Sequence, residues 1–161
     1  MPGMLYAVAG KIAAGKSTCV AALAAETGGL VLSEDVWLAT LYPAQITSLE
    51  DYRRESGRLR TAIAPLIVDL LKRGETVILD FPANTLPSRA WMRGLAEGGG
   101  AAAVIHFLDV PDAVCLDRLH ARNAAGTHEY APTDEEFALF TSHFVAPGED
   151  EGFTVVRHGV A

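Results

Sequence analysis

A short segment near the N-terminus has the residue types and spacing of a phosphate-binding loop. Residues 10–17, GKIAAGKS, fit the pattern G-x-x-x-x-G-K-[ST], and Thr18 follows them. Glycines let the backbone curl until successive N–H groups face one anion, and a following helix N-terminus adds partial positive charge. The predicted ATP-binding residues are Gly10, Ala13, Ala14, Gly15, Lys16, Ser17 and Thr18. In this pattern Lys16 reaches the β- and γ-phosphates, and the Ser17 hydroxyl binds Mg²⁺.

The surroundings of this loop strengthen the prediction and narrow the class of protein. The chain has three lysines, and two of them, Lys11 and Lys16, lie in the loop. An apolar run precedes the loop and a helical pattern follows it, which is the context that the motif needs. No N-K-x-D sequence for guanine recognition occurs, and 161 residues leave little room for the accessory regions of mechanical ATPases. The sequence therefore favours a compact phosphotransferase.

Asp80 ends the apolar run 77–79 and is a candidate second acidic group of the phosphate site. At the end of a buried strand, its carboxylate would hold Mg²⁺, usually through water. The alternative is that Asp80 only caps the turn before Pro82. We expect the magnesium role because the phosphate loop is present.

Asp35 follows a second short apolar run, residues 30–32. Open parallel sheets bind ligands at the carboxyl ends of their strands, so an aspartate there could accept the proton of an attacking hydroxyl. The alternative is that Ser33 and Asp35 cap the helix that follows. The spacing alone leaves both roles open.

Arg118 and Arg122 are four residues apart on a predicted helix and so share one face. Arginines beside the phosphates could clamp the transferring group and spread its charge. The alternative is a solvated arginine pair on the surface. The polar stretch 126–132 that follows suggests a lid over ATP, within residues 118–132.

Strand and helix patterns alternate along the whole chain. Strands are expected at 5–9, 30–32, 76–80, 102–108 and 153–156. Helices are expected at 17–26, 52–73, 87–97, 111–122 and 133–144, and Pro65 predicts a kink or a break in the second. Nearly continuous apolar strands between helices indicate an α/β fold with a parallel sheet covered on both faces. We expect one domain over residues 1–161.

The composition is that of a folded globular protein, with 50% apolar residues and a net charge of -7. That charge argues against general attraction to nucleic acid or an anionic membrane. Cys19 and Cys115 lack metal-ligand spacing, and no pair of histidines has such a context, so we expect two reduced thiols and packed or isolated histidines. Without a signal-like segment or a spanning apolar run, the sequence predicts a cytoplasmic protein with no membrane partner.

Several of these segments together resemble the small P-loop kinases of the zeta-toxin, chloramphenicol-phosphotransferase and polynucleotide-kinase type, often collected as an AAA-33-like family. The similarity covers the loop, the acidic turn 33–35, the segments 80–84 and 87–89, the stretches 108–111 and 118–123, and the tail 144–153. It implies a P-loop NTPase fold of the nucleoside-kinase-like type, a three-layer sandwich around a five-stranded sheet of order 2-3-1-4-5. It also implies that Asp35 is the general base and that Arg118 and Arg122 are lid arginines.

The expected function is transfer of the γ-phosphate of ATP·Mg²⁺ to a hydroxyl of a small molecule such as a sugar, nucleoside or antibiotic. Lys16, Asp35, Arg118 and Arg122 are the candidate catalytic residues. A polynucleotide 5′-hydroxyl kinase, a toxin acting on a sugar nucleotide and a non-catalytic ATP-binding regulatory protein remain as alternatives. Arg53, Arg54, Arg58 and Arg60 form a basic cluster, which we interpret as a solvated face interleaved with acidic residues.

Overall fold

A five-stranded parallel sheet forms the centre of the structure. The computed structural model describes residues 2–126 and 131–159. The strands are β1 (Met4–Ala9), β2 (Leu30–Ser33), β3 (Thr76–Asp80), β4 (Ala102–Leu108) and β5 (Thr154–His158). Their order is β2-β3-β1-β4-β5 with every neighbouring pair parallel, as the resemblance implied.

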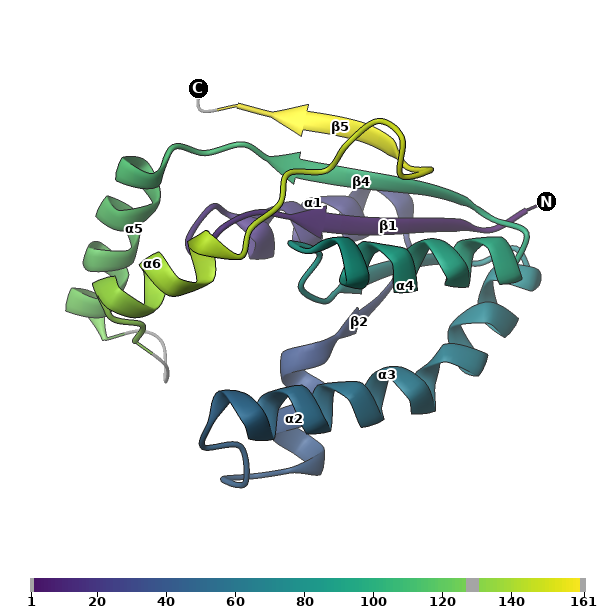
Figure 1. The fold of residues 1–161 in the computed structure, drawn as a ribbon. Coiled ribbons are helices and arrows are strands. Elements are labelled where there is room, and N and C mark those ends of the chain that lie inside the picture. Colours follow the sequence, from purple (N-terminus) through teal and green to yellow (C-terminus); the bar gives the residue numbers. More distant parts are fainter. Residues whose placement is uncertain (1, 127–130, 160–161) are drawn as a thin grey trace.

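Helices cover both faces of this sheet. Their bounds are α1 (Lys16–Thr27), α2 (Glu34–Leu41), α3 (Leu49–Lys72), α4 (Leu86–Gly98), α5 (Asp112–Ala125) and α6 (Asp134–Ser142). Figure 1 shows α4 in front of the sheet and α1 behind it, with α5 and α6 beyond the carboxyl ends of β1 and β4. The expected three-layer P-loop fold is confirmed.

Two apolar clusters hold the layers together because strand side chains alternate between faces. On one face, Leu5, Ala7 and Leu79 pack with residues of α3 and α4. On the other face, Val8 and Ile78 pack with residues of α1, α5 and α6. The β1 strand is buried on both faces, which explains its continuous apolar sequence.

The long helix α3 differs in part from its prediction. It begins at Leu49, three residues before the expected start, and runs for 24 residues with Pro65 inside it. The predicted break into two helices is wrong, whereas Figure 1 shows the helix bending along its length, as a proline kink would produce. Packing of Leu59, Ile63 and Ile67 on the core keeps both halves in one helix.

Within residues 2–126 and 131–159, no helix is both long enough and apolar enough to cross a membrane.

Candidate active site

The carboxyl ends of β1, β2 and β3 bring the predicted site residues to one edge of the sheet. Ser33, the last residue of β2, lies opposite Asp80, the last residue of β3. The loop after β1 leads into α1, whose first residue is Lys16. Asp35 is the second residue of α2, directly after β2. The parallel arrangement thus explains why residues far apart in sequence lie at one edge.

The phosphate loop has the backbone curvature that its sequence predicts. Gly15 has φ of 104° and Ala13 has φ of 64°, so two residues of the loop adopt left-handed conformations. For Ala13 this conformation costs about 1–2 kcal/mol, since its Cβ approaches the backbone. Nothing in the sequence marked Ala13 as strained, and such strain commonly accompanies a ligand-binding loop.

Asn84 fixes the start of this loop, and its role was missed from the sequence. The Gly10 N–H donates to Asn84 Oδ1 at 3.0 Å, and Asn84 Nδ2 donates to the Gly10 carbonyl at 2.9 Å. A Cβ at position 10 would lie 3.1 Å from Ala14 Cβ and 3.2 Å from Leu108 Cβ, so the glycine also permits close packing. Two reciprocal hydrogen bonds therefore join the loop to the segment after β3.

Lys16 folds back over the loop in this structure. Its Nζ donates to the carbonyls of Gly10 at 2.7 Å and Lys11 at 3.0 Å. Burial lowers the pKa of Lys16 to about 8, and this effect outweighs the opposing influence of the Asp80 and Asp35 carboxylates. An ammonium group that is buried in this way interacts strongly with a phosphate anion, because little water screens the two charges. Lys16 is thus poised to exchange loop carbonyls for phosphate oxygens.

A pocket of about 270 Å³ lies beside the loop. Its lining residues are Ala13, Gly15, Lys16, Ser17, Thr18, Arg118 and Arg122. The fold therefore brings five of the seven predicted ATP-binding residues together with both predicted arginines. Gly10 and Ala14 lie outside this lining, and Ala14 packs in the second apolar cluster.

The two arginines of α5 meet this pocket in different ways. Arg118 Nη1 donates to the Ala14 carbonyl at 3.3 Å, which ties α5 to the loop. Arg122 Nε is buried and has no hydrogen-bond partner among the described residues. A buried cationic donor without an acceptor is costly unless an anion binds it. The donor set of the pocket fits a polyphosphate such as that of ATP.

Asp35 faces the same edge from α2. Ser33 occupies the N-cap position of α2, yet its side chain makes no capping hydrogen bond. Partial burial raises the pKa of Asp35, the neighbouring Glu34 and Asp80 carboxylates raise it further, and Lys16 opposes them. An elevated carboxyl pKa of this origin is typical of groups that exchange protons. The role of general base stays a prediction.

Glu34 is the buried support beneath Asp35, and sequence reasoning did not find it. Its side chain is 1% exposed and accepts hydrogen bonds from Tyr52 and from Ser56 Oγ, the latter at 2.7 Å. Arg60 Nε lies 3.6 Å from Glu34 Oε2. These partners all come from α3, so the pairing fixes the first turn of α2 against α3 and thereby the position of Asp35.

Arg60 is largely buried, although we expected the basic cluster to form a solvent-exposed face. Its side chain is only 18% exposed, and its guanidinium lies 5.0 Å from the Trp91 ring centroid and 5.8 Å from that of Phe81. The expectation is wrong here because α4 and the segment after β3 cover this part of α3. No local pattern in the sequence indicates that Arg60 packs against these two rings.

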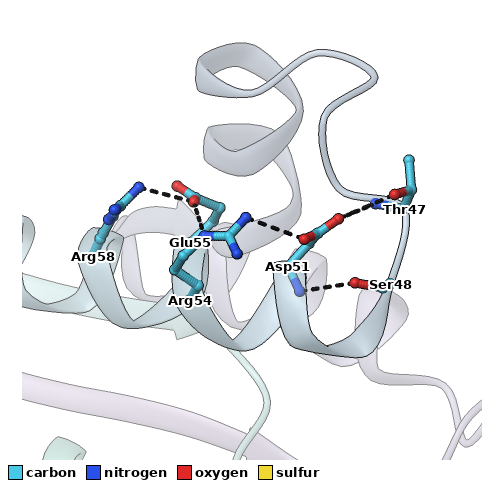
Figure 2. Close-up of polar contacts among 6 residues, drawn as sticks. All are labelled: Thr47, Ser48, Asp51, Arg54, Glu55 and Arg58. Carbon is cyan, nitrogen blue, oxygen red and sulfur yellow. Dashed lines mark hydrogen bonds and ion pairs between the residues drawn. The ribbon is translucent and has the colours of Figure 1, made fainter.

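At the start of α3, Arg54 and Arg58 are exposed, as the solvated-face interpretation expects, whereas the Glu55 side chain that both contact is buried. Figure 2 shows Arg54 and Arg58 directed at the Glu55 carboxylate, with N–O distances of 2.9 and 3.0 Å. Arg54 also pairs with Asp51 at 3.1 Å. Asp51 in turn accepts hydrogen bonds from Thr47, and its own N–H donates to Ser48 Oγ, which caps the helix. The charges of these two arginines are therefore neutralised locally.

The expected lid over residues 118–132 is only partly visible. Residues 118–125 belong to α5, and Gly126 ends that helix in a left-handed conformation. Residues 127–130 of the predicted lid lie outside the described residues. Asn123 Nδ2 donates to the Pro132 carbonyl at 2.9 Å and so joins the two ends of this stretch.

Comparison with known proteins identifies the fold family. The sequence profile of AAA_33, described as an AAA domain, matches residues 5–147. A search of curated proteins gave no significant match.

Solved structures of similar fold include several proteins described as kinases. A Chloroflexus aurantiacus protein with a provisional kinase assignment has a TM-score of 0.78 at 19% identity, covering 98% of this chain and 85% of that one. A gluconokinase from Sinorhizobium meliloti has a TM-score of 0.61 at 17% identity, covering 97% and 82%. The Mycobacterium tuberculosis APS kinase CysC, solved with AMPPNP and APS, has a TM-score of 0.61 at 22% identity, covering 98% and 88%. These likenesses confirm the P-loop kinase fold.

Proposed function

Since the chain belongs to the AAA_33 family, we propose that it is an ATP-dependent phosphotransferase acting on a hydroxyl group of a small molecule. The observation that carries this proposal is the pocket where Lys16, Ser17, Arg118 and Arg122 meet beside Asp35. The buried Arg122 Nε in this pocket has no acceptor among the described residues. The nearby Asp35 carboxyl has a raised pKa. Cations for a polyphosphate and a base for a hydroxyl are the two requirements of phosphoryl transfer.

In this proposal each side chain has a separate role. ATP bound with Mg²⁺ supplies the phosphoryl group, which passes to the acceptor oxygen as its bond to ADP breaks. Ser17 and Asp80 supply the oxygen ligands that Mg²⁺ prefers. Lys16, Arg118 and Arg122 stabilise negative charge on the phosphates, and Asp35 takes the hydroxyl proton onto its carboxylate. Glu34 and its partners on α3 hold Asp35 in place.

We call Asp35 of α2 and the facing residues of α3 the acceptor side. This region suits a small acceptor better than a polynucleotide. A nucleic-acid substrate needs unpaired basic groups leading to Asp35. Arg54 and Arg58 instead pair with acidic residues, and Arg60 lies against Glu34 and two aromatic rings. The gluconokinase and the APS kinase of similar fold are named for small-molecule acceptors, which supports the same class here.

The test is transfer of labelled phosphate from ATP to a panel of hydroxyl compounds. The panel contains sugars, nucleosides, antibiotics, sugar nucleotides and a 5′-hydroxyl oligonucleotide. We expect a labelled small molecule with the wild type and none with Asp35→Asn, while Asp69→Asn, a change at an exposed position of α3, retains transfer. Labelling of the oligonucleotide alone would establish the polynucleotide kinase instead. Tight ATP binding with no labelled product from any acceptor class would favour the regulatory protein.

A further inference from the structure

A second cluster of reactive side chains lies on the sheet face that α1 covers, apart from the phosphate pocket. Cys19 of α1, His106 of β4 and His158 of β5 each offer one ligand atom, and these atoms all lie within 4.8 Å of one another. The sequence gave no sign of this cluster, because the three residues are separated by at least fifty positions and have no motif spacing. The structure thus brings His106 and His158 beside a cysteine, a grouping that our expectation of packed or isolated histidines did not include.

The parallel register of β4 and β5 explains how the histidines meet. His106 lies opposite Val156, and His158 lies opposite Leu108, so the histidines are diagonal neighbours on the same face. Their rings stack with centroids 5.1 Å apart, and His106 Nδ1 is 2.8 Å from His158 Nε2. Cys19 lies one helical turn after the start of α1, which packs on this face.

The donor atoms of this cluster have few other partners. The two facing ring nitrogens share a single hydrogen bond, and no hydrogen bond to Cys19 Sγ occurs in the part of the chain that the structure describes. Cys19 and His106 are partly buried, while His158 is exposed. Three donors thus converge on a point with one side open to solvent.

We propose that Cys19, His106 and His158 form a binding site for a divalent transition-metal ion of the zinc type. One thiolate and two imidazoles suit a borderline-soft ion in tetrahedral coordination, with a water in the fourth position. Bonds of about 2.0–2.1 Å to nitrogen place two tetrahedral nitrogens about 3.3 Å apart. To bind one ion, the two nitrogens must move apart by about 0.5 Å from their present 2.8 Å contact, and the rings must turn so that both lone pairs face the ion. The proton that they now share moves to a ring nitrogen that does not bind the ion. The thiol proton is released to solvent when the ion binds.

The site would join α1 to the neighbouring strands β4 and β5. In the sheet that the structure describes, β5 is the edge strand beside β4. Cys19 directly follows the pocket residue Thr18. A bound ion would fasten α1, the helix that carries the phosphate loop, to this edge of the sheet. The Glu26 carboxylate on α1 acts on His106 electrostatically and would offset part of the added positive charge.

The experiment titrates the untagged, chelator-treated full chain with Co²⁺ and then with Zn²⁺, without nucleotide. Cobalt reports both its thiolate ligand, through charge-transfer absorption, and its tetrahedral geometry, through intense visible bands. We expect one Co²⁺ per chain with both signals, and complete displacement by Zn²⁺. Cys19→Ser should remove the charge-transfer signal, and His106→Gln and His158→Gln should each weaken Zn²⁺ binding by about tenfold or more.

Matched controls separate this site from incidental metal binding. Cys115→Ala removes the other thiol, and His120→Gln removes an exposed histidine that pairs with Asp134. Both controls should bind as the wild type does, and circular dichroism in chelator should show every variant folded. The proposal is overturned if the thiolate signal survives in Cys19→Ser, if the controls weaken binding equally, or if no stoichiometric ion binds the wild type. ATP transfer is not part of this readout, so either proposal can fail alone.

Discussion

The two sides of the proposed active site are built in contrasting ways. On the phosphate side, one contiguous segment supplies the loop, and cationic groups of Lys16 and Arg122 face a pocket. On the acceptor side, Glu34 accepts hydrogen bonds from Tyr52 and Ser56 and lies within ion-pair distance of Arg60, while Asp35 beside it is accessible to solvent. The phosphate side therefore has cationic donors available to bind a ligand. On the acceptor side, most polar groups pair with one another and hold Asp35 in position. This contrast predicts that changes on the two sides affect different measurements.

Among changes that affect ATP binding, the largest effect is expected for Lys16→Met on the phosphate side. Loss of the ammonium removes the charge that faces the phosphates, so phosphate transfer should fall by about 10³-fold and ATP affinity should fall with it. Stability should not decrease, since a desolvated amine is replaced by an apolar side chain. Calorimetric ATP titration and thermal unfolding check both parts. The control is Lys11→Met, which removes a partly exposed lysine paired with Asp112. An equal loss of ATP affinity and transfer in this control would contradict a specific role for Lys16.

On the acceptor side, Glu34→Ala should act on stability first. It leaves the Tyr52 and Ser56 hydroxyls and the Arg60 guanidinium without their shared partner, which should cost about 3 kcal/mol of unfolding free energy. ATP affinity should stay close to that of the wild type. Urea denaturation measures the loss, and Glu97→Ala, an exposed partner of Arg93, should cost less than about 0.5 kcal/mol. Equal losses in the two variants would mean that the Glu34 network contributes little.

These two sides also differ in how far the sequence predicted them. The loop and the strand ends follow from local patterns, and the order of the strands follows from the resemblance to small P-loop kinases. The structure brings most predicted ligands of ATP into one pocket. Glu34, Arg60 and Asn84 were missed because their partners lie 18 to 74 positions away, beyond any local pattern. Arg89 was missed for the same reason. It is fully buried and donates to Glu151 and to the carbonyls of Ala83 and Val145.

A smaller effect is expected for Asn84→Ala. This change separates the role of the residue that holds the loop from the role of the charge that binds phosphate. It removes both hydrogen bonds to Gly10 but no charge, so the loop is less well held and the Kd for ATP should rise by about tenfold. The transfer rate at saturating ATP should change less than the Kd. Asn123→Ala removes a hydrogen bond of similar length to Pro132 and serves as the control. A fall in the saturated rate with no change in Kd would contradict this role.

A gradual effect is expected for the pH dependence of ATP affinity, with little change at neutral pH. The pKa of Lys16 is about 8, so its ammonium is present below that pH and is lost as the pH rises above it. ATP affinity should therefore be steady from about pH 7 to pH 8 and then fall by up to about tenfold per pH unit. Lys16→Arg keeps its charge throughout this range and should lose that alkaline fall. A fall shared equally by both proteins would assign it to another group.

The most direct test of the account separates ATP binding from phosphate transfer in Asp35→Asn. This change removes the proposed base but leaves Lys16, Ser17, Arg118 and Arg122 in place. We predict an ATP Kd within about twofold of the wild type, together with a single-turnover transfer rate lower by about 10²- to 10⁴-fold. Loss of ATP affinity comparable to that in Lys16→Met, or an unchanged transfer rate, would contradict the assignment of Asp35 to the acceptor side.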